Sequence, residues 1–119
     1  MSQTLMFWSE RSDDTTVVLY SPPFEAAAME SGTVFLGILA VSTVTVSLIC
    51  EESCDPNNPN SWSTVGGTAS GSATGNFRAL VGGQTGGSTN TVGPWIRVRA
   101  TVAVTSGGVV WSGGIVMRS

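Results

Sequence analysis

The sequence predicts an all-β protein: an antiparallel β-sandwich of about seven or eight strands in jelly-roll or Greek-key order, with at most one short helix near residues 24–31. Three observations predict it. Short segments rich in β-branched and aromatic residues recur along the chain, several of them alternate apolar and polar residues, and Gly, Pro, Ser and Asn separate them. No helical crossover of about 10 to 15 residues lies between them, which excludes parallel α/β folds. An immunoglobulin-like sandwich is the alternative.

Residues 1–14 are interpreted as an N-terminal arm or a first short strand, and residues 15–119 as a single sandwich domain. The arm is polar and acidic except for one apolar stretch, which consists of Leu5, Met6, Phe7 and Trp8. This stretch packs either on its own domain or on a neighbouring molecule, since exchanged arms are a common route to oligomers. Phe7 and Trp8 are therefore candidate contact residues for a partner.

Two elements are expected before the central apolar run. Residues 15–21 are β-branched and aromatic, and Pro22 and Pro23 cannot continue a hydrogen-bonded ladder, so a strand ends there. The stretch Phe24–Ser31 has good helix formers, and Gly32 follows as a stop signal. About one or two turns of helix are the most that this stretch can supply.

A long apolar run extends from Thr33 to Cys50. Its front part, Val34–Val41, is apolar on both faces, as expected of a strand that is covered on both sides. Its rear part alternates, and its apolar face consists of Val44, Val46, Leu48 and Cys50. Because Ser and Thr interrupt the run, it is interpreted as strands rather than as a membrane-spanning helix. The N-terminus also lacks the basic and apolar regions of a signal peptide, so no membrane partner is expected.

The second half of the chain reads as short strands separated by glycine-rich turns. Between residues 62 and 92, apolar residues recur too often for a flexible linker: Trp62, Val65, Phe77, Leu80 and Val81. Residues 95–105 alternate most cleanly. The predicted core positions are Ile96, Val98, Ala100, Val102 and Val104, and the predicted outward positions are Trp95, Arg97, Arg99, Thr101 and Ala103. Residues 106–108 are expected to make a hairpin turn into a closing strand.

Charged residues make up only 11 % of the chain, compared with about 25 % in a typical soluble domain. There is no Lys and no His, and the formal net charge is −3. Nucleic acid is therefore not expected as a partner, because a phosphate-binding face needs many basic residues. The absence of His removes the usual general base and the commonest metal ligand, so neither enzymatic activity nor a cofactor is predicted. The low charge favours lasting contact with another protein.

The loop ICEESCDPNNPNSW, residues 49–62, holds both cysteines and admits three interpretations. Structural zinc needs four ligands, whereas Cys50 and Cys54 offer two; the loop's oxygen atoms could serve Ca²⁺, but their spacing matches no EF-hand. An extended chain would separate the two cysteines by about 13 Å, against about 5.5 Å in a disulfide, unless a turn intervenes. The favoured interpretation is two reduced cysteines and a turn built by residues 55–60, without a metal.

Trp95, Arg97 and Arg99 form a stripe on the outward face of their predicted strand. Such a stripe can contact a sugar, a base or a partner protein. The alternative is a solvated face that pairs with an acid on the neighbouring strand. Because Arg and Trp are enriched at interface hot spots, a protein contact is favoured over a small ligand.

Two segments carry a resemblance to a known family. They read VTVSLICEESCDPNNPNSWSTVGGTASGSATG and GPWIRVRATVAVTSGGVVWSGGIVMRS. A V-x-V strand leads to an acidic or Asn-rich loop with a following Trp, then to a glycine-rich stretch, a W-[IV]-R-V-R strand and a closing hairpin. Over Val44–Ser119 this pattern resembles small virion proteins of tailed bacteriophages, the capsid decoration or cement proteins. The two cysteines in the loop depart from the family's pattern.

The resemblance implies a jelly-roll or similar sandwich without catalytic activity, made in the host cytoplasm and located on the outer capsid surface of the virion. Such proteins usually form homo-oligomers, commonly trimers, and bridge subunits of the major capsid protein. The residues expected to make contacts are Phe7, Trp8, Trp95, Arg97 and Arg99. The alternative function is a carbohydrate-binding or adhesion module. An enzyme built on the acids of the loop is disfavoured, because nothing places a second carboxylate opposite them.

Overall fold

The structure is a computed structural model, and it describes residues 2–13, 16–26, 31–41, 44–85, 88–90, 94–104 and 107–118, with side chains for 16–26, 31–39, 44–81, 94–104 and 107–118. Within these residues there are ten strands and no helix. The strands are β1 (Ser2–Asp13), β2 (Val17–Tyr20), β3 (Phe24–Glu25), β4 (Ser31–Val41), β5 (Val44–Ser53), β6 (Ser63–Gly71), β7 (Gly75–Thr85), β8 (Ser88–Asn90), β9 (Trp95–Val104) and β10 (Gly108–Arg118).

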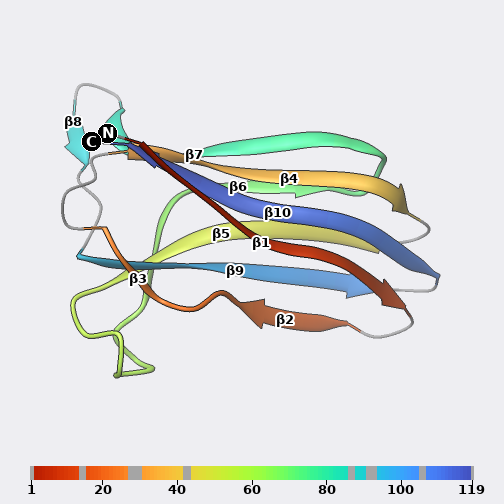
Figure 1. Cartoon of the computed structure of the whole chain (residues 1–119), viewed down its shortest axis with the longest axis horizontal. Helices are drawn as coiled ribbons and strands as arrows, with labels where there is room; N and C mark the ends of the chain where they lie inside the picture. The colour runs from red at the N-terminus through yellow and green to blue at the C-terminus, as the bar shows by residue number, and fades with distance from the viewer. Residues whose placement is uncertain are drawn as a thin grey trace.

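The strands form two antiparallel sheets that face each other (Figure 1). The first sheet has the order β1-β10-β4-β7-β8, and the second has the order β2-β9-β5-β6, with β3 also paired to β9. Strands of the first half of the chain pair with strands of the second half, as β1 with β10, β2 with β9, β4 with β7, and β5 with β6. The eight strands other than the short β3 and β8 therefore form one long hairpin that is rolled into two sheets. This confirms the predicted sandwich and gives it the jelly-roll order.

The segment between β9 and β10 corrects one expectation. The sequence predicts a hairpin at residues 106–108, but β9 belongs to the second sheet, whereas β10 pairs with β1 and β4 in the first. The connection crosses from one sheet to the other. When β3 and β8 are set aside, β5 and β6 are the only described strands that follow each other along the chain and also pair with each other. This order excludes the immunoglobulin-like alternative, in which several consecutive strands pair as hairpins.

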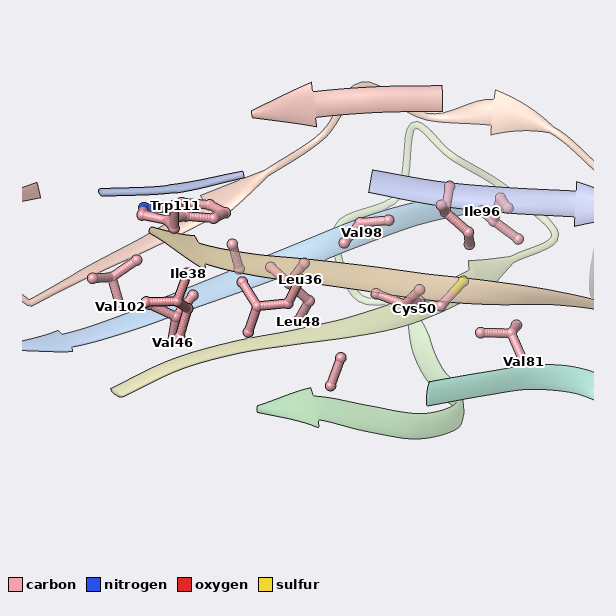
Figure 2. Packing of buried hydrophobic residues seen from close by; sticks show 14 of the residues in the cluster. Leu36, Ile38, Val46, Leu48, Cys50, Val81, Ile96, Val98, Val102 and Trp111 are labelled. Atoms are coloured by element: carbon pink, nitrogen blue, oxygen red, sulfur yellow. The ribbon is translucent and has the colours of Figure 1, made fainter. Parts of the chain in front are cut away.

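The core lies between the two inner faces, and the predicted alternation of β5 and β9 is confirmed (Figure 2). Every second residue of β5 from Val44 to Cys50 is buried, and the same holds for β9 from Ile96 to Val102, whereas Val104 is half-buried. The first sheet contributes large side chains, including Leu36, Ile38 and Trp111. Each such side chain stabilises the fold by about 1.5–3 kcal/mol on burial, so the sandwich has a sizeable apolar core.

The segment around residues 24–31 has no described helical residue. Phe24 and Glu25 form β3, and Ser31 is the first residue of β4. The backbone N–H of Ala26 donates to the carbonyl oxygen of Pro94 at 2.8 Å, which continues the pairing of β3 with β9. Residues 27–30 of the predicted helical stretch lie outside the described residues.

The N-terminal arm is a full edge strand. β1 pairs with β10 from Ser2 to Asp13, with a bulge between Met6 and Trp8 that falls on Phe7. Trp8 pairs with Gly113, which is buried. The side chains of Phe7 and Trp8 lie outside the described residues. The backbone of β1 is nevertheless part of the first sheet, since it pairs over its whole length.

Candidate functional site

The outer face of the second sheet holds the predicted arginine stripe. Glu51 of β5 is the register partner of Arg97 of β9. The Nε of Arg97 donates to Oε1 of Glu51 at 2.8 Å, and the Nη1 of Arg99 donates to Oε2 at 3.1 Å. Both carboxylate oxygens of Glu51 are thus engaged, and Glu51 is buried. This arrangement supplies the neighbouring-strand acid that one interpretation of the stripe required.

Two aromatic rings enclose the Arg97 guanidinium. Its central carbon lies 4.3 Å from the centroid of the Tyr20 ring and 4.3 Å from the centroid of the Trp62 ring, over the face of each. A cation at this distance over two ring faces gains cation–π attraction from both rings. The stack ties β2, β9 and the loop before β6 together on one face of the sheet.

The predicted contact residues are therefore brought together only in part. Trp95, Arg97 and Arg99 share one face, as expected from the alternation of β9. The side chains of Arg97 and Arg99 are 19 % and 35 % exposed, and both bind Glu51. Phe7 belongs to the other sheet, in β1, together with Trp8. A partner contact by any of these five residues remains a prediction.

The loop between β5 and β6 contains two consecutive β-turns, as the sequence predicted. The N–H of Asn58 donates to the carbonyl oxygen of Asp55 and the N–H of Ser61 to that of Asn58, each at 3.1 Å. The side chain of Asp55 accepts from the N–H of Asn57, and that of Asn58 from the N–H of Asn60. A proline at the second position of each turn fixes its φ angle. In Figure 1 this yellow-green loop projects beyond the sheets at the lower left.

The two cysteines are free, which confirms the interpretation that they are reduced. Cys50 is buried in the core, and Cys54 is exposed at the start of the loop. Burial, with smaller contributions from the negative charges of Glu52 and Glu51, raises the pKa of the Cys50 thiol to about 12. Among the described residues, no group of three or more His, Cys, Asp or Glu side chains is arranged to hold a metal ion.

A thiol reagent should distinguish the two cysteines. We expect a maleimide at neutral pH to modify Cys54 alone in the folded protein, because the thiolate is the reactive form and Cys50 is both buried and held protonated. In denaturant both should react. Mass spectrometry of the intact protein counts the adducts, and Cys54→Ser is the control that should remain unlabelled when folded. Rapid labelling of Cys50 in the folded protein would contradict the described packing.

The outer face of the first sheet corrects the expectation for Val34–Val41. The sequence predicts a strand covered on both faces, but on the outer face of β4 Phe35 and Leu39 are exposed, although Thr33 on the same face is buried. Phe35 and Leu39 are 40 % and 71 % exposed, and Leu80 on the neighbouring strand β7 is 72 % exposed. Leu80 is the register partner of Thr33, two residues along the strands from Phe35, and exposed large apolar side chains on adjacent strands are typical of an interaction surface.

A hollow lies on this same face, over Gly37. It is lined in part by Phe35, Asn76, Arg78 and Ser112, which come from the adjacent strands β10, β4 and β7. The sequence analysis did not select these residues. A signal was available, since Leu80 follows Asn76 and Arg78 at outward positions in the alternation of β7, where a polar residue would be expected. Whether another part of the chain covers an outward apolar residue such as Leu80 depends on the tertiary fold, which the alternation of one strand does not show.

Comparisons with known proteins do not assign the chain to a family. Its sequence matches no family model, and no curated protein matches it significantly. None of the described segments is a helix with the length and apolarity that a membrane span requires.

Proposed function

We propose that this chain is a non-enzymatic structural protein of a tailed bacteriophage, a capsid decoration or cement protein that binds the major capsid protein lattice and stabilises it. In this proposal the protein is made in the host cytoplasm, forms homo-oligomers, and lies on the outer capsid surface. It needs no cofactor, nucleic acid or membrane. Because a lattice presents many identical sites, each contact can be weak while the decoration as a whole is stable.

The observation that carries the proposal is the set of exposed apolar side chains on the outer face of β4 and β7. Phe35, Leu39 and Leu80 expose apolar area that costs free energy in water and gains it against a partner. In a monomer these apolar side chains stay in contact with water. In a protein that is bound to a partner surface, the partner buries them.

Two further features support the proposal. A surface with few charges, in a chain of which only 11 % is charged, suits close packing against a neighbour. Jelly rolls also recur in viral capsid proteins, although the same fold occurs in lectins and cupins, so the fold alone supports the proposal only by analogy. The sugar-binding alternative has weaker support, because Tyr20 and Trp62 each have one ring face against Arg97 instead of open for stacking.

The test uses capsids of the phage that encodes the chain. We expect mass spectrometry of purified particles to find the chain in many copies. We also expect shells stripped of the chain to open at a lower temperature, and added chain to restore the higher temperature, since a ligand that binds only the assembled lattice stabilises it. Absence from particles, or shells that are equally stable with and without the chain, would contradict the proposal. Specific binding to a glycan array by a monomer would favour the carbohydrate-binding alternative.

A further inference from the structure

Three strands meet at the hollow over Gly37. Ser112 of β10 and Asn76 of β7 are the register partners of Gly37 in the two neighbouring ladders. A Cβ atom on Gly37 would lie 3.1 Å from Ser112 Oγ and 3.4 Å from Asn76 Oδ1. Two polar side chains therefore converge over a backbone position that has no side chain. The hollow is lined by these two polar side chains and by apolar ones, including Phe35, and no side chain rises from its floor at Gly37.

Arg78 supplies a positive charge to this hollow. It pairs with Phe35, two residues along the strands from the pair formed by Gly37 and Asn76, and it lines the same hollow. Its side chain is exposed and has no ion-pair partner among the described residues. The guanidinium groups of Arg97 and Arg99, in contrast, are already bound to Glu51. Arg78 is thus available to an external acceptor.

The polar side chains that line the hollow can all donate hydrogen bonds. Arg78 has only donors, the Ser112 hydroxyl can donate, and the carboxamide of Asn76 presents its NH₂ group after rotation about its last torsion. Among the residues whose side chains the structure describes, no Asp or Glu lines the hollow. Donors without a competing negative charge select an anionic acceptor, and a carboxylate makes the strongest such bonds with a guanidinium. The exposed apolar residues Phe35, Leu39 and Leu80 lie on the same face. A partner surface that complements this face is therefore apolar and presents a carboxylate to the hollow.

Charge decides between two occupants of this face. If a second copy packed face to face about a two-fold axis that passes near the hollow, it would bring a second Arg78 toward the first, and the described residues of the hollow offer no acid to pair with either. A different partner with an acidic side chain avoids this repulsion. Because the chain as a whole has a net charge of −3, an unpaired Arg also directs an acidic partner to this face and away from the others.

We propose that the outer face of β4 and β7 is the docking face for another protein, which inserts an Asp or Glu side chain into the hollow over Gly37 and bonds it to Arg78. The inference rests on the proposed function, in which the partner is the major capsid protein. Phe35 and Leu80, which flank Arg78, pack against apolar side chains of the partner and exclude water from the ion pair. Exclusion of water strengthens the pair and makes its loss costly.

The test measures binding to shells assembled from the major capsid protein of the same virus, free of the chain. Co-sedimentation at a series of concentrations gives the dissociation constant for the wild type, Arg78→Glu and Leu80→Ser. Two variants serve as matched controls. Arg118→Glu makes the same change in net charge, from −3 to −5, at the exposed end of β10, and Val18→Ser removes a half-exposed apolar side chain from the second sheet. All four positions are exposed, so each variant should keep the wild-type circular dichroism spectrum and melting temperature.

We expect Arg78→Glu and Leu80→Ser each to weaken binding by about tenfold or more, and the two controls to bind like the wild type. If the wild type binds the shells and Arg78→Glu and Leu80→Ser bind equally well, the inference is overturned while the proposed function stands. If the wild type does not bind, the proposed function fails and the inference fails with it. Wild-type oligomers that Leu80→Ser dissociates would assign the face to a second copy and overturn the inference. So would binding to acidic glycans that Arg78→Glu abolishes.

Discussion

Replacing Leu48 with Ala should lower the free energy of unfolding by about 2–5 kcal/mol. Leu48 lies on the inner face of β5 and is fully buried between the two sheets (Figure 2). The substitution removes the transfer free energy of the side chain and leaves a cavity that close-packed neighbours cannot fill. Urea unfolding followed by circular dichroism measures the change. Since a domain of this size is stable by only about 5–15 kcal/mol, the loss is a large fraction of the total.

The chain contains a matched control for this substitution. Leu80→Ala is the same chemical change at a side chain that is 72 % exposed, so it should alter the free energy of unfolding by at most about 0.5 kcal/mol. Comparing two Leu→Ala variants removes effects that depend on residue type alone. Equal destabilisation by the two would mean that the faces of β5 and β7 are not arranged as described, or that Leu80 is covered in solution by another copy.

Replacing Glu51 with Gln should lower the free energy of unfolding by about 1–3 kcal/mol. The variant keeps the size of the side chain but removes the negative charge that holds Arg97 and Arg99. One amide position also becomes an NH₂ group, which cannot accept from either guanidinium. The two positive charges then remain close together without a carboxylate. Because both arginines are partly exposed, water screens part of this repulsion, and the effect stays below that of a fully buried pair.

An exposed acid provides the control for the second prediction. Glu25 lies in β3 on the same sheet, and Glu25→Gln should change the free energy of unfolding by less than about 0.5 kcal/mol. A double variant, Glu51→Gln with Arg97→Met, tests the coupling. If the two groups stabilise each other, the double variant should lose less than the sum of the two single variants. Additive losses would show that Glu51 and Arg97 act independently, which would contradict the pairing.

The candidate surfaces divide into a part that the sequence predicted and a part that it did not. The outward position of Arg97 follows from the two-residue period of its own strand, so the sequence predicted it correctly. Its partners do not follow from that period. Glu51 is 46 residues away, and the rings of Tyr20 and Trp62 reach Arg97 only because β2 and β5 lie on either side of β9. The sequence therefore predicted that Arg97 faces outward, but not that the chain itself binds it.

The sequence by itself determined the all-β class, the inward and outward faces of β5 and β9, and the turns at residues 55–61. These features depend on period, β-branching and turn chemistry, which act over a few residues. Only the tertiary structure decided that β9 and β10 lie in different sheets and that Phe35 and Leu39 on the outer face of β4 are exposed. A hairpin and a crossover between sheets need the same short Gly-rich connection, and β10 joins the first sheet because β1 and β4 are its partners there. In the same way, an apolar strand face predicts that its side chains are buried, but it does not predict what buries them. The arrangement of the other strands decides whether the chain itself or a partner covers that face.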